Sequence, residues 1–170
     1  MNLPKLFEMQ RVLDQRIMDK HPELKGQDNL EWKVLALQVE LGECANEYRG
    51  FKKWSNDQEP RTAWKQPSYG GGYIERNLLL EEYVDCLHFI LSIGLETGYE
   101  QEYSSFKLDS ISRSFIYLMQ KVADFYAIPT RGNYARIVMV FLGLGELLGF
   151  TLEQIEQAYF EKNEINHIRQ

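Results

Sequence analysis

Two pairs of carboxylates stand out in the sequence, because the members of each pair are three residues apart. Glu40 and Glu43 form the first pair, and Glu82 and Asp85 form the second. Residues at this spacing share one face of a helix. Apolar residues surround both pairs, so these acids do not fit an ordinary solvated face. Because like charges repel, the spacing predicts a positive partner, and hard oxygen ligands favour a hard cation such as Mg2+.

The two pairs can act together only if their helices lie antiparallel and adjacent. Such a site could hold two Mg2+ ions that bridge a di- or triphosphate and lower the pKa of a bound water. A neighbouring carboxylate would then take the proton as general base. Lys162 and Arg169 could neutralise charge on the phosphate oxygens. The chain has no Walker or Rossmann glycine motif, so metal and side chains would have to bind the phosphates.

Helical periodicity covers most of the chain and predicts an all-α bundle, with residues 1–170 as a single domain. The expected helices cover residues 3–20, 28–51, 74–97, 108–128, 133–148 and 151–170. No run typical of a strand stands out. The segment that begins at Ile137 is apolar nearly all round, which predicts either a central helix or one at a subunit interface.

A long loop is expected between the two carboxylate helices, because periodicity disappears over residues 52–73 and prolines and glycines accumulate. Four of its residues are basic, and Trp54 and Trp64 add aromatic surface. A mobile loop of this composition could close over a nucleotide, but a flexible solvated insertion explains it equally well. No motif assigns a role to residues 55–74.

Other polar residues have two interpretations each. Gln10 and Asp14 lie four apart beside an apolar stripe, where side chains either stay solvated or border a pocket. His88 follows Asp85 by three residues, but a di-iron site needs two Glu-x-x-His motifs, so His88 is expected to be a hydrogen-bonded core residue. Lys162, Asn166 and Arg169 share a face of the last helix, which is either a solvated tail or a phosphate grip.

Composition narrows the function classes. The formal net charge of −6 argues against general affinity for nucleic acids or anionic membranes. The longest apolar run, 137–150, is too short to span a membrane, and no signal peptide is evident. Cys44 and Cys86 are expected to be free thiols in a reducing cytoplasm.

The carboxylate pairs also carry a family resemblance. Glu-x-x-Glu on one helix followed by Glu-x-x-Asp on another resembles the all-α, MazG-like nucleoside triphosphate pyrophosphohydrolases, and most closely the dimeric dUTPases. The matching stretches are LFEMQRVLD, ELGECANEYRGFKKWS, LEEYVDCLHFILSIGL and YFEKNEINHIRQ. These stretches span most of the chain.

The resemblance implies a role for each matching residue. Metal binding would fall to the four acids, with two or more Mg2+ ions per site and Mn2+ as a substitute. Glu43 would activate the attacking water, with Glu40 the next candidate. The remaining residues would bind substrate: Gln10 and Trp54 the uracil and deoxyribose, Lys162 and Arg169 the phosphates, and Asn166 either the phosphates or the nucleoside.

The resemblance also implies an activity and an assembly. Members of the family cleave dUTP and dUDP to dUMP by attack at the β-phosphorus, and they work as homodimers in which both subunits shape the pocket. Three alternatives stay open. The same chemistry could act on dCTP or another non-canonical nucleotide, the protein could bind a regulatory partner, or the metal site could be purely structural.

Overall fold

The computed structural model describes residues 1–169 and shows a helical bundle that carries one small two-stranded sheet. Its elements are α1 (Leu3–Lys20), the short 3-10 helix η1 (Pro22–Leu24), α2 (Leu30–Tyr48), β1 (Trp64–Pro67), β2 (Tyr73–Arg76), α3 (Leu78–Thr97), α4 (Ile111–Ala127), α5 (Arg131–Leu147) and α6 (Leu152–Arg169). The predicted all-α bundle of six helices is therefore confirmed for the described residues.

Local capping explains where several of these helices begin and end. Asn77 caps α3 by accepting a hydrogen bond from the backbone N–H of Leu80 at 3.0 Å. The same helix ends at Gly98, whose φ of 68° suits a left-handed cap. Thr151 and Gln154 exchange hydrogen bonds at the start of α6, which is the geometry of a capping box.

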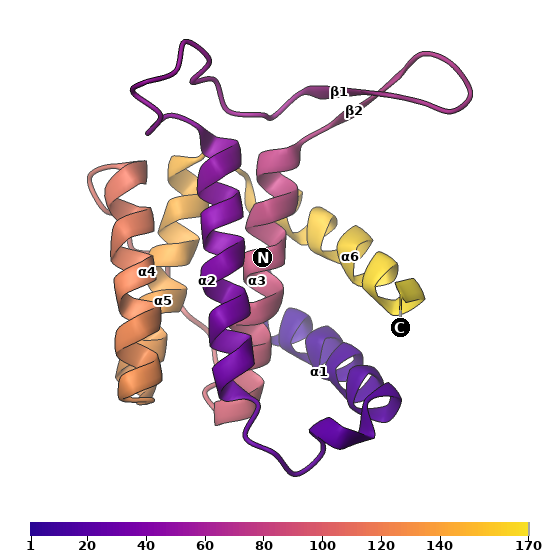
Figure 1. Cartoon of the computed structure of the whole chain (residues 1–170). Coiled ribbons are helices and arrows are strands. Elements are labelled where there is room, and N and C mark those ends of the chain that lie inside the picture. Colours follow the sequence, from indigo (N-terminus) through magenta and orange to yellow (C-terminus); the bar gives the residue numbers. More distant parts are fainter. Residues whose placement is uncertain (170) are drawn as a thin grey trace.

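Helices α2 and α3 form the central antiparallel pair of the bundle (Figure 1). Helices α4 and α5 pack on one side of this pair, while α1 and α6 lie on the other. Leu37 and Leu41 of α2 and Leu87 of α3 are almost completely buried in the shared core. The antiparallel neighbours that the two carboxylate pairs require are therefore present.

The apolar helix α5 is largely buried within the bundle, where it packs beside α4 and α3. Ile137, Phe141 and Leu144 are buried within the bundle. The ring of Phe141 stacks on that of Tyr83 with centroids 4.2 Å apart, and the Tyr83 hydroxyl donates to the Phe141 carbonyl at 3.0 Å. A Cβ at Gly143 would lie 2.2 Å from the carbonyl oxygen of Phe106, so this close approach requires glycine. Taken singly, none of the helices within residues 1–169 is long and apolar enough to cross a membrane.

The expectation that no strand is present was wrong. β1 and β2 pair antiparallel, with Trp64 opposite Arg76 and Pro67 opposite Tyr73. The hairpin extends away from the bundle (Figure 1), and every residue of both strands is exposed. Its residues therefore show no alternation of buried and exposed positions, the pattern from which strands are predicted. β2 also takes residues that the sequence assigned to the start of the second carboxylate helix.

The chain between α2 and β1 is anchored to the bundle. Arg49 donates a hydrogen bond to the Asp57 carboxylate at 2.7 Å, and Nη1 of Arg61 lies 3.1 Å from Oε1 of Glu47. The backbone continues this attachment, because the N–H of Arg61 donates to the Glu47 carbonyl and the N–H of Leu79 donates to the Arg61 carbonyl. The first half of the predicted loop is thus an ordered connection, and the hairpin occupies the second half.

Candidate active site

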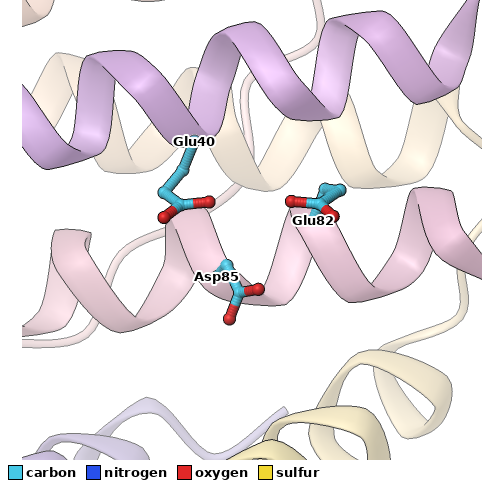
Figure 2. Close-up of side chains that lie close together, drawn as sticks. All are labelled: Glu40, Glu82 and Asp85. Atoms are coloured by element: carbon cyan, nitrogen blue, oxygen red, sulfur yellow. The ribbon is translucent and has the colours of Figure 1, made fainter.

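Three of the predicted acids converge between the central helices. Glu40 projects from α2, and Glu82 and Asp85 project from α3 (Figure 2). Each offers a carboxylate oxygen, and these oxygens all lie within 4.8 Å of one another. All three side chains are half-buried. A divalent cation among them would meet three hard oxygen ligands, which is the donor set expected for Mg2+ or Mn2+.

The electrostatics of this cluster also fit a cation. Burial raises the pKa of Glu40 to about 7, and the charges of Asp85 and Glu43 add to the rise. Burial and the same two charges raise the pKa of Glu82 to about 7. Near neutral pH the protein alone therefore does not fully compensate the negative charge. A bound cation would supply the missing positive charge and displace the protons.

Glu43 lies next to this cluster without joining it. Its charge acts on the pKa of both Glu40 and Glu82, so it is close to them. Its own side chain is exposed to solvent on α2. An exposed carboxylate beside three half-buried ones can reach water more easily than they can, which is compatible with the predicted role as general base.

Helix α6 brings a lysine to the acid cluster. Lys162 donates a hydrogen bond to Oδ2 of Asp85. Burial raises the pKa of Asp85, while Lys162 and Arg169 act in the opposite direction. Helix α6 is therefore a wall of the site, and Lys162, which was expected to contact phosphate, pairs with one acid of the cluster.

The acid cluster opens into a cavity of about 340 Å³. The cavity is lined by residues of α1, α2, α3 and α6, namely Gln10, Leu13, Asp14, Ile17, Trp32, Glu40, Asp85, His88, Phe89, Ser92, Lys162, Asn166 and Arg169. Its volume falls in the range of small-molecule sites. One part of its wall is apolar or carries buried polar groups, and another part carries carboxylates together with Lys162 and Arg169. The cavity can therefore receive a ligand that is part aromatic and part anionic.

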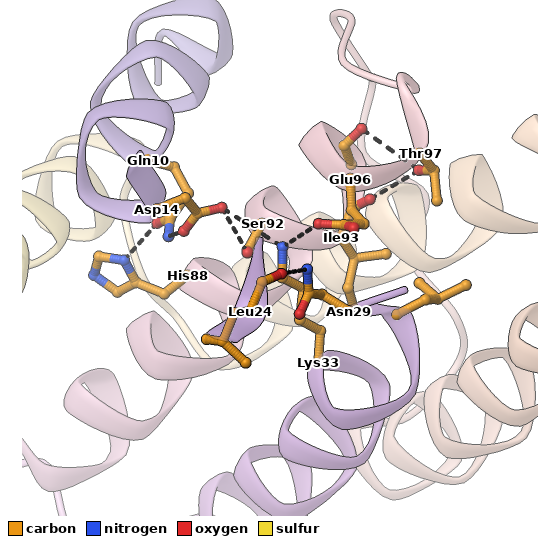
Figure 3. Close-up of polar contacts among 12 residues, drawn as sticks. Gln10, Asp14, Leu24, Asn29, Lys33, His88, Ser92, Ile93, Glu96 and Thr97 are labelled. Atoms are coloured by element: carbon orange, nitrogen blue, oxygen red, sulfur yellow. Dashed lines mark hydrogen bonds and ion pairs between the residues drawn. The ribbon is translucent and has the colours of Figure 1, made fainter. Parts of the chain in front are cut away.

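Gln10 is buried at the wall of this cavity, although the sequence left it between a solvated edge and a pocket. Its Oε1 accepts hydrogen bonds from His88 Nδ1 and from the Tyr159 hydroxyl, both at 2.8 Å. Its Nε2 donates to Asp14 Oδ1 at 2.7 Å (Figure 3). The amide orientation is thereby fixed, with Oε1 fully engaged and one N–H of the amide left for a ligand.

His88 is the buried, hydrogen-bonded residue that the sequence predicts, and it is also part of the cavity wall. Its ring stacks on Tyr159 with centroids 4.2 Å apart. Burial lowers the pKa of His88 to about 3, so the ring is neutral near pH 7. Within residues 1–169 its Nε2 is buried without a hydrogen-bond partner. With Nδ1 donating to Gln10, Nε2 is an acceptor for an N–H or O–H of a ligand.

The other predicted substrate residues divide into two groups. Asn166 and Arg169 line the cavity together with Lys162. Trp54 does not: its side chain is 78% exposed and packs edge-on against Phe51 with ring centroids 5.8 Å apart. The structure therefore does not bring Trp54 together with the other candidates, and its contact with the base stays a prediction.

Several residues in the cavity wall or behind it escaped the sequence interpretation. Ser92 and Phe89 were not singled out, and Lys33 was not connected to Asp14. The signal available for Ser92 was its spacing, four residues after His88 and seven after Asp85, which places all three on one face of α3. For Lys33 the sequence offers no comparable signal, because its partners are remote in the chain.

Comparison with known proteins identifies the class to which this fold and site belong. The family model described as dUTPase matches residues 2–170, which is essentially the whole chain. The chain therefore belongs to the dUTPase family, of the dimeric, all-helical type. It is an enzyme, a dUTP diphosphatase, and its substrate is a nucleotide. No curated protein matches the chain.

Proposed function

We propose that this enzyme hydrolyses dUTP, and also dUDP, to dUMP with Mg2+ as its cofactor. The observation that carries this proposal is one continuous cavity, whose wall runs from Gln10 and His88 at one part to Glu40, Asp85 and Lys162 at another. A nucleotide has the same division, with a hydrogen-bonding base and an anionic phosphate chain. Both predicted halves of the substrate therefore have matching chemistry in a single cavity.

The metal would be held by Glu40, Glu82 and Asp85, with Glu43 beside them. A divalent cation bound there would neutralise phosphate charge and polarise the phosphorus centre that is attacked. We propose two or more Mg2+ ions per site, with Mn2+ as a substitute, because the acids outnumber the ligands that one Mg2+ ordinarily takes from a protein.

Side chains of the protein would then accept the proton of the attacking water and offset the negative charge of the phosphates. Glu43 takes a proton from the attacking water, with Glu40 as the next candidate. The water oxygen bonds to the β-phosphorus, and the bond between that phosphorus and the bridging oxygen of the α-phosphate breaks. dUMP leaves with this bridging oxygen. Lys162 and Arg169 offset the charge on the phosphate oxygens, and Asn166 donates hydrogen bonds from α6.

The base would occupy the part of the cavity beside Gln10. The free N–H of its amide can donate to a carbonyl of uracil, and the Nε2 of neutral His88 can accept from a donor group on the nucleoside. Trp54 would join the site only after the connection around it moves. Buried polar groups such as these discriminate strongly against a base that leaves them without a partner.

We also propose that the active form is a homodimer. Leu35 and Val39 lie on one face of α2 and are 62% and 50% exposed. Trp32, one turn earlier on the same helix, lines the cavity. A second copy on this face would cover apolar surface and bring its own residues close to the cavity, as the family resemblance implies.

The experiment that tests the function is a comparison of nucleotides by kcat/KM in the presence of Mg2+. Purified protein is incubated with dUTP, dUDP, dCTP, dTTP and UTP, and the monophosphates are quantified. We expect dUTP and dUDP to be the best substrates, with dUMP as product. A kcat/KM for dCTP that equals or exceeds the value for dUTP would contradict the assignment of uracil. It would not contradict the proposed metal-dependent hydrolysis.

A further inference from the structure

A lysine that the proposed chemistry does not use is buried behind the cavity wall. The Lys33 side chain on α2 is only 3% exposed. Its Nζ lies 2.7 Å from Oε2 of Glu96 on α3 and 3.9 Å from Oδ2 of Asp14 on α1 (Figure 3). Burying an ammonium group is expensive unless it is paired, and apolar residues often stabilise a core equally well. The position of this cluster beside a ligand cavity therefore calls for an explanation other than stability.

Asp14 is the member of the cluster that reaches the cavity. Its Oδ1 accepts from Gln10, and its Oδ2 accepts from the Ser92 hydroxyl, both at 2.7 Å. The side chain keeps 17% of its surface exposed and forms part of the cavity wall. An ionised carboxylate offers about four acceptor positions. Gln10, Ser92 and Lys33 engage up to three of them, which leaves acceptor capacity for a ligand.

The charge state of Asp14 depends on its neighbours. Burial raises the pKa of Asp14, whereas the hydrogen bond from Ser92 and the charge of Lys33 act in the opposite direction. Glu96 raises it slightly. The other ionisable groups that line the cavity are Glu40 on α2, Asp85 and the neutral His88 on α3, and Lys162 and Arg169 on α6. Tyr159 on α6 contacts Gln10 behind the wall. Burial is the largest of these effects, so the pKa of Asp14 is raised even with Lys33 present. Without Lys33 it would rise further, and Asp14 would take up a proton at higher pH.

We propose that Lys33 is a positioning residue: it keeps Asp14 ionised and fixed, so that Asp14 accepts a hydrogen bond from the imino N–H of the bound pyrimidine. This inference rests on the proposed function, because it requires a base in the cavity. Protonation would place a hydrogen on one of the two oxygens of Asp14, which removes its charge and part of the acceptor capacity that the imino group requires. The free N–H of Gln10 beside Asp14 supplies the complementary donor for the adjacent carbonyl of the base.

The test is the Lys33→Met variant, which removes the charge at similar length. We expect KM for dUTP and Kd for dUMP to rise about tenfold, with kcat changing less, because an interaction with the base is lost rather than one with the phosphates. The rise should grow as the pH is lowered and Asp14 takes up a proton, because burial raises the pKa of this acid. Lys33→Arg should restore most of the binding. Lys107→Met is the matched control, since Lys107 pairs with Glu146 at 3.1 Å on the surface.

A second variant distinguishes positioning from simple stabilisation. Replacing the ion pair by Lys33→Met with Glu96→Met removes the buried charge of Lys33 together with the charge of its partner, and should recover thermal stability. If Lys33 positions Asp14, dUMP binding stays weak in this double variant. Recovery of dUMP binding together with stability would overturn the inference, as would unchanged Kd in Lys33→Met. Calorimetry with dUMP needs no turnover, so failure of the wild-type enzyme to hydrolyse dUTP would count separately, against the proposed function.

Discussion

Lys162 on the last helix donates a hydrogen bond to Asp85 on α3, across a separation of 77 residues in the chain. The lysine thereby occupies the position of a positive partner at the acid cluster. When a cation and a phosphate chain enter, Asp85 would turn to the cation and Lys162 to the phosphate. The ion pair in this structure is then the resting arrangement of two groups that act separately during the reaction.

Lys162→Met should therefore lower the activity on dUTP and raise the affinity of the acid cluster for Mn2+. Loss of the phosphate contact should lower kcat/KM for dUTP about 10- to 100-fold. Removal of a competing positive charge should tighten the binding of Mn2+ to the acid cluster. Steady-state kinetics and metal titration measure the two effects. The control is Lys25→Met, because Lys25 pairs with Asp19 on the surface. Weaker Mn2+ binding in Lys162→Met would contradict this account.

Glu43→Gln should separate catalysis from metal binding. If Glu43 is the general base, kcat should fall about 10²- to 10⁴-fold. Metal binding should decline far less, because Glu40, Glu82 and Asp85 still offer three oxygens. Glu31→Gln, on the same helix, is the control. Unaltered kcat in Glu43→Gln would exclude Glu43 as the base and leave Glu40 as the candidate.

The stability of the metal-free protein should depend on the protonation of Glu82. The pKa of this acid is raised to about 7 in the folded protein, mainly by burial, from an ordinary value of 4.5. A raised carboxylate pKa means that the folded state binds the proton more tightly, so its contribution to stability is present below about pH 4.5 and is lost as pH rises through 7.

Glu82→Gln removes this titration. Without metal, the variant should have a higher Tm than the wild type at pH 8, and the difference should shrink as the pH is lowered to 5. Excess Mg2+ should reverse the order at pH 8, because the wild type alone keeps its full ligand set. Thermal unfolding at several pH values tests this, with the exposed Glu164→Gln as control. A difference in Tm between Glu82→Gln and the wild type that does not depend on pH would contradict this role of Glu82.

The proposed dimer face on α2 is tested by Leu35→Glu combined with Val39→Lys. Charges on an apolar interface should dissociate the dimer, and sedimentation would then show a monomer. Activity should fall as well if the partner shapes the cavity beside Trp32. Val12→Glu is the control, since Val12 is 55% exposed on α1. A doubly substituted protein that sediments like the wild type would show that this face is not the interface.

The periodicity of apolar residues was sufficient to predict the helices, because it depends only on residues that are close in the sequence. The three-residue spacing within the pairs Glu40 and Glu43, and Glu82 and Asp85, predicted that each pair shares a helix face. Three of these four acids meet in one cluster, and Glu43 lies beside it. Spacing also made Gln10 and Lys162 candidates, and the family resemblance gave each its role in substrate binding. Both line the cavity in the structure.

Interactions between remote segments could not be predicted in this way. Lys33 meets Glu96 across 63 residues, and Asp14 meets Ser92 across 78. No periodicity relates such positions, since the crossing of α1, α2 and α3 decides which side chains meet. The hairpin was missed for a different reason. Its strands are exposed on both faces, so they lack the alternation of apolar and polar residues that marks a half-buried strand.

The most direct test of the central claim is the release of dUMP from dUTP by the purified wild-type protein, with Mg2+ and with the metal chelated. The account predicts dUMP and pyrophosphate in equal amounts with Mg2+ and none with chelator. Glu40→Gln, which alters a half-buried ligand of the cluster, should reduce the rate strongly without unfolding the protein. Folded wild-type protein that releases no dUMP in the presence of Mg2+, or that releases it equally fast with chelator, would contradict the account.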